Sequence, residues 1–358
     1  QIYDKTFKDP TKLGVVFEYP VKDSEAPVSN GTMPAQVDDE VAASPAGANA
    51  ASVDFIGAGN HAFRQLMPAF SKANADLSIV VSQKGASGLR AARKFGFRHN
   101  VSFGQYDFVN GAAPNIVIAS RHDTHFDYVS SALEHGRNVF VEKPLCLTTS
   151  ELDALQKQHQ QLQTSHPDGA PVLMVGFNRR FAPHVRKAKD LLNKIPVAKS
   201  IILTINAGHI PTDHWTQDSE VGGGRLIGEC CHFIDLACFL VGVPVVSFTK
   251  DCMKSAANDT FTIGLRFADG SIATIHYFAN GHRAVQKEKI DIFVDGRVLQ
   301  IHNFRSMQGH GWQNFRKLNL WKQDKGQTEC VKAFLESVSS QKSAAIPPED
   351  IFESMRLT

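Results

Sequence analysis

From residue 53 to residue 177 the sequence alternates between short apolar runs and helical patterns, and this alternation constrains the fold more than any other feature. The apolar runs read VDFI, LSIVV, NIVIAS, NVFV and PVLMVGF, and segments such as GLRAARKFG and HFDYVSSALEHG lie between them. Strands that alternate with helices are typical of a parallel sheet covered by helices on both faces. We therefore predict an α/β Rossmann domain over residues 53–175.

The pattern changes after Gly176. Strand-like segments such as SIILTINAG, TFTIGLRF, SIATIHYFA and RVLQIHNF now follow one another, several of them joined by turns such as ADG and VDG. Short turns between strands indicate antiparallel pairing. We predict an α+β domain with a large, mostly antiparallel sheet over residues 176–358, with helices at 182–192, around 232–240 and at 328–338.

The first 52 residues do not fit either domain. Residues 1–25 contain one strand-like piece, LGVVFEYP, which is too small to fold alone, and we interpret it as the remnant of a preceding domain. Residues 26–52 are rich in Ala, Pro, Ser and Gly and contain almost no large apolar residue. That composition is typical of a flexible linker.

Charge and cysteine content exclude several classes of function. The formal net charge is +2 with 21% charged residues, which gives no reason to expect a nucleic acid or an anionic membrane as partner. No apolar run reaches the roughly 18 residues of a membrane span. The six cysteines show no metal-binding spacing, so we expect no metal and a reducing, cytoplasmic location.

The turn after the first predicted strand reads FIGAGNHA. Gly57, Gly59 and Ala62 have the G-x-G-x-x-A spacing, with Asn60 and His61 inside the turn. In a strand–turn–helix context these residues allow a tight turn and a close approach of the backbone to a pyrophosphate, which then lies at a helix N-terminus. We predict that this turn binds a dinucleotide.

The end of the second predicted strand bears on the choice of cofactor. An NAD-binding domain commonly has Asp or Glu there to hold the ribose 2′-hydroxyl. This chain has Ser82, followed by Lys84. A hydroxyl and a cation suit a 2′-phosphate, so NADP is favoured over NAD, although both remain open.

Two segments carry the candidate chemistry. Glu142, Lys143 and Pro144 end a predicted parallel strand, where ligands bind in open α/β sheets, and a lysine there can donate to a substrate hydroxyl. The segment GGGRLIGECCHFID places His232 in an apolar helical pattern. A histidine can exchange a proton near neutral pH, so it is a candidate acid or base for alcohol oxidation.

These motifs resemble the Gfo/Idh/MocA family of oxidoreductases. The resemblance rests on the glycine turn, on SRHDTHFDYVSSALEHGRNVFVEKP and on the glycine-rich segment that leads to His232. NAGHIPTDHWTQDSEVGGGRLIGECCHFID is similar to a subgroup in which this module follows a zinc-type alcohol-dehydrogenase-like domain in polysaccharide contexts. The resemblance implies hydride transfer at a carbinol carbon of a sugar, sugar nucleotide or cyclitol.

The resemblance also implies roles for individual residues. Lys143 would bind the substrate and stabilise its alkoxide, His232 would be the general acid or base, and His125 would lie near the nicotinamide. The family commonly has an aspartate four residues before its catalytic histidine, but this chain has Gly228 there. Glu229 and Asp235 could substitute, or they could be structural ion-pair partners. The remaining cofactor contacts implied are Ser120, His122 and Glu142.

Polar residues elsewhere suit a polyhydroxylated or phosphorylated substrate. Arg179 follows the last strand of the first domain, and Asp213 and His214 lie in a polar loop before the glycine run. Together with Glu229 and His232 they form the predicted substrate site. We also expect a homo-oligomer through the C-terminal sheet. The alternative function is a non-catalytic NAD(P)-binding sensor or scaffold module of the same fold.

Overall fold

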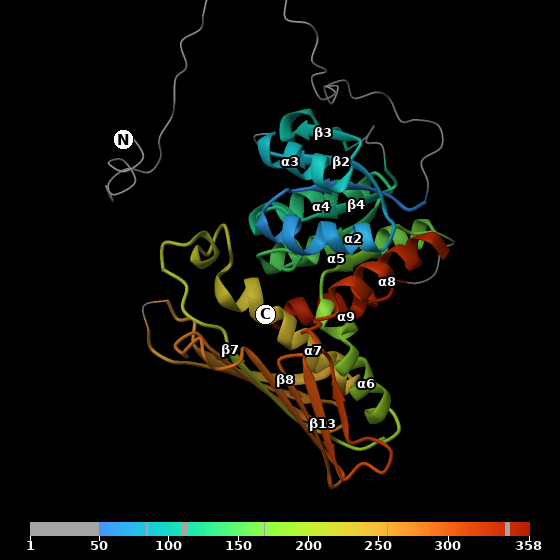
Figure 1. Ribbon diagram of the computed structural model, residues 1–358. Coiled ribbons are helices and arrows are strands. Elements are labelled where there is room, and N and C mark those ends of the chain that lie inside the picture. Colours follow the sequence, from blue (N-terminus) through green and yellow to red (C-terminus); the bar gives the residue numbers. More distant parts are fainter. Residues whose placement is uncertain (1–49, 84, 109–112, 168, 256, 341–343) are drawn as a thin grey trace, which may run out of the picture. The chain divides into compact units, whose positions relative to one another are not determined.

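The computed structural model describes residues 50–83, 85–108, 113–167, 169–255, 257–340 and 344–358. The predicted domain remnant at 1–25, nearly all of the predicted linker and Lys84 lie outside these residues. Figure 1 shows two sheets, one formed by the first half of the described chain and one by the second.

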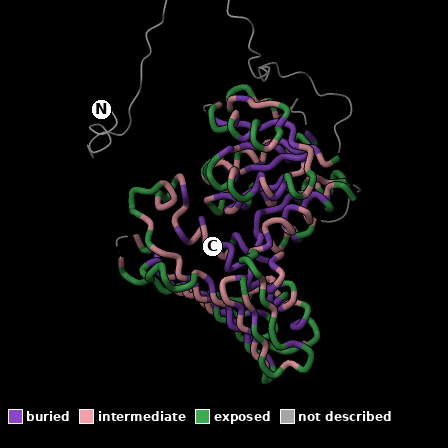
Figure 2. Tube along the Cα trace, in the orientation of Figure 1, coloured by how far each residue is buried: buried purple, intermediate pink, exposed green. Residues whose placement is uncertain are grey.

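The first sheet has six parallel strands in the order β3-β2-β1-β4-β5-β6. Its central strands are buried on both faces, and Figure 2 draws them largely in purple. Because helices cover both faces of such a sheet, its central strands are rich in apolar residues. The strands are β1 (Ser52–Ile56), β2 (Asp76–Ser82), β3 (His99–Ser102), β4 (Asn115–Ile118), β5 (Asn138–Val141) and β6 (Leu173–Val175).

The connections between these strands are helical. The first begins as a π-helical turn, η1 (Ala62–Leu66), and continues as α2 (Met67–Lys72). Pro68 has no N–H, so the α-helical hydrogen bond to the carbonyl of Arg64, four residues earlier, cannot form. The π-helical turn η1 lies where this bond is missing. The other connecting helices are α3 (Ala86–Phe95), α4 (His125–Glu134) and α5 (Thr149–Ser165).

The second sheet has eight strands in the order β14-β13-β12-β11-β7-β10-β9-β8. All its pairs are antiparallel except β7 with β10, so the prediction of a mostly antiparallel sheet is confirmed. The strands are β7 (Ser200–Asn206), β8 (Val245–Cys252), β9 (Phe261–Phe267), β10 (Ile272–Phe278), β11 (Glu288–Val294), β12 (Arg297–His302), β13 (Ser306–His310) and β14 (Lys317–Asn319).

One face of this sheet is covered by α6 (Pro183–Leu192) and α7 (Cys231–Val241) (Figure 1). Burial alternates along β7 for this reason: Ile201, Leu203 and Ile205 point to the covered face and are buried, whereas Ile202 points to the other face and is exposed. Period-2 alternation is what a sheet with one covered face requires. The opposite face therefore carries exposed apolar side chains, among them Ile202, Ile272 and Phe293.

The last two helices, α8 (Gln327–Ser340) and α9 (Pro348–Arg356), return to the first sheet. Figure 1 shows the red α8 beside the blue α2. Phe334 of α8 has its ring centroid 6.4 Å from that of Phe70 and 5.6 Å from that of Phe140. The end of the chain thus belongs to the core of the first sheet, although its sequence follows the second.

Candidate active site

The glycine turn after β1 has the geometry that its sequence predicts. Gly57 has φ +104°, and a Cβ atom there would lie 2.4 Å from the carbonyl oxygen of Ala119. A side chain is therefore excluded by the neighbouring strand. Gly59 differs, because a Cβ atom there would have no neighbour within 4 Å. Its backbone is open to an approaching group, while Ala62 is buried against the sheet.

At the end of β2, Ser82 is buried and its hydroxyl accepts a hydrogen bond from the backbone N–H of Gly88 at 3.1 Å. This contact holds the first turn of α3 against the strand. The hydroxyl is therefore already engaged, and Lys84 lies outside the described residues.

The ends of β4 and β5 bring together the predicted nicotinamide-side residues. Ser120, His122, His125, Glu142 and Lys143 all line one cleft of about 1060 Å³, as does His61. His61 Nε2 lies 3.3 Å from Glu142 Oε1. Burial opposes ionisation of Glu142, but the charges of His61 and Lys143 outweigh burial and hold its pKa below the ordinary value.

Two histidines of this region are held by backbone carbonyls. His125 Nδ1 lies 2.6 Å from the oxygen of Pro144, and His122 Nδ1 lies 2.8 Å from the oxygen of Gly222. Because a carbonyl can only accept, Nδ1 of each ring carries the proton. Burial lowers the pKa of His125 and lowers that of His122 to about 3, so both rings are neutral at pH 7.

His232 reaches the same cleft from α7, in the second half of the chain. Burial lowers its pKa well below the ordinary range, and the positive charges of Arg179 and Lys143 lower it further. Its Nδ1 atom has no hydrogen-bond partner among the described residues. The ring is thus a neutral base, and no protein carboxylate in the described chain orients it.

Lys143 contacts the turn that precedes α7. Its Nζ donates to the backbone oxygen of Gly228 at 2.6 Å. Gly228 belongs to η6 (Leu226–Cys230), a π-helical turn that leads directly into α7. The contact joins the EKP turn of the first half to the segment that carries His232, so the two predicted catalytic residues face one cleft.

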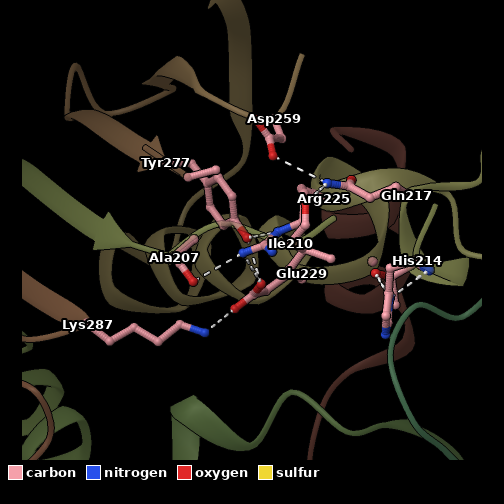
Figure 3. Close-up of polar contacts among 12 residues, drawn as sticks. Ala207, Ile210, His214, Gln217, Arg225, Glu229, Asp259, Tyr277 and Lys287 are labelled. Carbon is pink, nitrogen blue, oxygen red and sulfur yellow. Dashed lines mark hydrogen bonds and ion pairs between the residues drawn. The ribbon is translucent and has the colours of Figure 1, made fainter. Parts of the chain in front are cut away.

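The two carboxylates near His232 have other partners. Asp235 is fully buried, and its oxygens accept from Arg180 Nε at 2.8 and 2.9 Å. Arg180 also binds Asp350 of α9 at 2.7 Å. Glu229 pairs with Arg225 at 3.0 Å and Lys287 at 2.6 Å, and Figure 3 shows it between them. Both carboxylates are therefore ion-pair partners.

Arg179 is buried and lines the cleft, as predicted for a substrate-site residue, but its guanidinium is bound to Glu288. Its Nε and Nη2 atoms lie 3.1 and 2.8 Å from the two carboxylate oxygens. Of the predicted loop residues, Asp213 and His214 are exposed and lie outside the cleft lining. His214 instead accepts from the N–H of Thr216 and caps a short 3-10 turn. Trp215 and Thr216, the next two residues, line the cleft.

Comparison with known sequences decides the family. Residues 51–165 match the Gfo/Idh/MocA "Oxidoreductase family, NAD-binding Rossmann fold", and residues 199–310 match the "GFO/IDH/MocA C-terminal domain". The chain belongs to the Gfo/Idh/MocA family of oxidoreductases.

Curated relatives of this Gfo/Idh/MocA protein include two inositol dehydrogenases. Myo-inositol 2-dehydrogenase of Thermotoga maritima is 24% identical over 66% of this chain and 72% of its own length. Inositol 2-dehydrogenase 2 of Saccharopolyspora erythraea is 28% identical over 56% of this chain and 57% of its own length. The chain thus spans little more than half of the second relative.

Solved structures share the fold at low identity. A levoglucosan dehydrogenase in complex with NADH and levoglucosan superposes with a TM-score of 0.74 at 18% identity, covering 86% of this chain and 94% of that one. A 3-ketoreductase from Actinomadura kijaniata in complex with NADP and TDP-benzene gives 0.72 at 16% identity, covering 85% and 94%. Both share the two-sheet architecture of this chain.

The structure also brings to the Gfo/Idh/MocA cleft residues that the sequence analysis missed. Lys287 precedes β11, and the segment 320–325 follows β14, far from the predicted site in sequence. Trp321 is 90% exposed at this edge of the cleft. The only sequence signals were the charged run KEK and the loop WKQDKG, which are also common on ordinary surfaces.

Two further observations concern the described residues alone. They contain no group of three or more His, Cys, Asp or Glu side chains placed to hold a metal ion. None of the helices resolved there is both long and apolar enough to cross a membrane.

Proposed function

We propose that this protein is an NAD(P)-dependent oxidoreductase that moves a hydride to or from a secondary alcohol or ketone carbon of a sugar, sugar nucleotide or cyclitol. The observation that carries the proposal is the convergence of Lys143 and His232 on one cleft at the carboxyl ends of parallel strands. The names of the relatives support the substrate class, since they act on inositols.

The residues of the glycine turn suit a dinucleotide. The open side of Gly59 leaves room for a pyrophosphate, and Asn60, His61 and Ala62 follow it at the start of η1. We propose that Ser120, His122, His125, Glu142 and Lys143 surround the nicotinamide end. The cofactor, when bound, supplies the hydride chemistry.

In this proposal His232 takes the hydroxyl proton during oxidation and returns it during reduction. The ring is neutral at pH 7 and is therefore in the form that accepts a proton, although burial and the charges of Arg179 and Lys143 make it a weaker base than a free histidine. Lys143 stabilises the developing alkoxide with an N–H donor, and the carbonyl of Gly228 holds its ammonium near the reacting carbon. Arg179 and Glu229, which line the cleft, remain proposed substrate contacts, whereas Asp213 and His214 lie outside its lining and are no longer proposed.

The test is the variant His232→Ala, assayed with NAD(P) and a panel of inositols, pyranosides and sugar nucleotides. We expect kcat to fall by about 10²–10⁴ while the cofactor affinity stays unchanged. His276→Ala is the matched control, because His276 lies on β10 outside the cleft and bonds to Thr262. Unchanged turnover in His232→Ala would remove this residue from the mechanism.

A non-catalytic NAD(P)-binding sensor or scaffold is the second candidate. It is favoured by the unpartnered Nδ1 atom of His232. Binding of the cofactor without turnover across the whole panel would support it. The same binding measurements compare the affinities for NADP and NAD. A clear preference for NAD would contradict the prediction from Ser82 and Lys84 that NADP is favoured.

Three broader predictions accompany this function. We propose a homo-oligomer through the outer face of the C-terminal sheet, where Ile202, Ile272 and Phe293 are exposed. The fusion to an alcohol-dehydrogenase-like domain concerns residues 1–25, outside the described chain, and stays a prediction. So does the cytoplasmic location, which rests on the cysteine pattern.

A further inference from the structure

Two carboxylates beside the cleft are each shared by two cations. Glu229 lies 3.0 Å from Arg225 Nη2 and 2.6 Å from Lys287 Nζ (Figure 3). Glu288 lies 2.8 Å from Arg179 Nη2 and 2.7 Å from Lys325 Nζ. The two groups thus have the same composition: one carboxylate, one arginine and one lysine.

Both carboxylates are ionised. Burial opposes their charge, but Lys287 and Arg225 hold the pKa of Glu229 at about 2, and Arg179 and Lys325 hold that of Glu288 below its ordinary value. Since each carboxylate neutralises only one of its two cations, each group keeps one positive charge in excess.

The excess charge faces the cleft that holds His232. Arg179, Arg225, Lys287 and Lys325 all line it, and the positive charges of Arg179 and Lys325 both act on the His232 ring. Of the other carboxylates in the lining, Glu142 pairs with His61, and Asp324 offsets one positive charge. Lys72, Lys143 and Lys322 also line the cleft, so an excess of positive charge remains.

The arginines are fixed whereas the lysines are accessible. The side chains of Arg225 and Arg179 are 3% and 7% exposed, against 40% for Lys287 and 26% for Lys325. Arg225 Nη1 is buried without a hydrogen-bond partner among the described residues. Each lysine ammonium has three donors and gives one to its carboxylate. Unused donors and excess charge remain for a ligand.

A purely structural role would not need this arrangement. One cation neutralises a carboxylate, so the second cation of each group leaves a positive charge that its own group does not neutralise. An anion bound in the cleft would use the second cation of each group and would be held by charge-assisted hydrogen bonds.

We propose that the substrate carries an anionic group, a carboxylate or a phosphoryl group, that binds Lys287 and Lys325 with Arg225 and Arg179 behind them. This inference rests on the proposed function only in calling the ligand a substrate. The anionic group lies on the part of the molecule that does not react, and so it positions the carbinol carbon near His232 and Lys143.

The test measures calorimetric binding of glucose, glucuronate and glucose 6-phosphate to the full chain with NAD(P), with inorganic phosphate as the simplest probe. The variants are Lys287→Met and Lys325→Met, which leave Glu229 paired with Arg225 and Glu288 paired with Arg179. Lys289→Met is the matched control. Lys289 is 38% exposed and paired with Asp291, on the same strand but outside the cleft.

We expect the anionic sugars to bind more tightly than glucose, and each cleft variant to weaken them about tenfold while Lys289→Met does not. The glucuronate and phosphate arms tell which anionic group is preferred. Equal binding of the three sugars, no binding of any anion, or unchanged anion binding in both cleft variants would overturn the inference. Anion binding without turnover of any substrate would instead defeat the proposed function and leave the anion site standing.

Discussion

The ring of His122 occupies the space beside Gly228. A Cβ atom at position 228 would lie 3.2 Å from His122 Cε1 and 3.0 Å from the carbonyl oxygen of Gly222, to which His122 is hydrogen-bonded. A side chain at this position, such as the carboxylate that the family resemblance implied, would therefore require His122 or Gly222 to shift. The histidine that follows β4 fills the place instead.

This packing predicts the behaviour of Gly228→Ala. Alanine normally stabilises a helix relative to glycine, but here we expect a loss of about 1–2 kcal/mol in the free energy of unfolding because His122 must shift. When His122 is already replaced by Ala, Gly228→Ala should lower the free energy of unfolding by at least about 0.5 kcal/mol less than it does in the natural protein. A double-mutant cycle with urea denaturation measures this difference. Gly104→Ala, where a Cβ atom meets nothing within 4 Å, is the control. Additive effects of the two changes would show that the ring does not restrict position 228.

The two glycines of the dinucleotide turn should respond differently to the same substitution. Gly57→Ala places a Cβ atom 2.4 Å from a backbone oxygen at a positive φ, so we expect a loss of about 2–4 kcal/mol of stability. Gly59→Ala meets no atom, so its thermal unfolding without cofactor should match the natural protein within about 0.5 kcal/mol. Its affinity for NAD(P), measured by fluorescence titration, should nevertheless fall about tenfold or more. Unaltered affinity would mean that the dinucleotide does not lie on this turn.

Arg180 and Asp235 are predicted to act in stability and not in catalysis. Arg180→Met leaves the fully buried Asp235 without its main partner and should cost about 3–5 kcal/mol. The double variant Arg180→Met/Asp235→Leu removes the unpaired charge, so chemical denaturation should show most of the lost stability restored. A double variant no more stable than the single one would argue against the ion pair as the reason for burying both residues.

His122 should make stability depend on pH. The pKa of His122 is about 3 in the folded state and 6.5 in the unfolded chain. Between pH 3 and pH 6.5 the unfolded state therefore binds more protons than the folded state. The stabilising contribution is complete above pH 6.5 and is lost as the pH falls toward 3. His122→Asn keeps a donor for Gly222 but cannot titrate, so the natural protein should lose about 1–2 kcal/mol relative to it between pH 7 and pH 5.

Urea denaturation of both proteins at each pH measures this difference. Above pH 7 the difference should be constant, which provides the internal control. A constant difference across the whole range would show that His122 has the same pKa in both states.

Local patterns were sufficient for much of the fold and for the central residues of the site. Gly57 and Gly59 could be recognised because their turn lies between a strand and a helix. Lys143 stands out at the end of a strand, and His232 in an apolar helix. Strands β3, β13 and β14 escaped prediction because they are short and lack an apolar run.

The ion-pair partners of the acidic residues near His232 could not be predicted from local patterns. Glu229 and Asp235 both lie three residues from His232, and a regular helix would have allowed either to reach it. The π-helical turn at Leu226–Cys230 changes the angular spacing just before α7, and the nearest cations, Lys287 and Arg180, come from distant segments.

The sequence by itself determined which residues could perform chemistry, because a glycine turn, a strand-end lysine and a histidine in a helix are local features. Only the tertiary structure decided what surrounds them. The two acidic neighbours of His232 are used in ion pairs, His122 fills the space at Gly228, and two carboxylates each hold two cations at the cleft. The physical reason is that charge balance and free volume depend on segments far apart in the sequence, such as those of Glu229 and Lys287 or of Arg179 and Glu288, which no local pattern records.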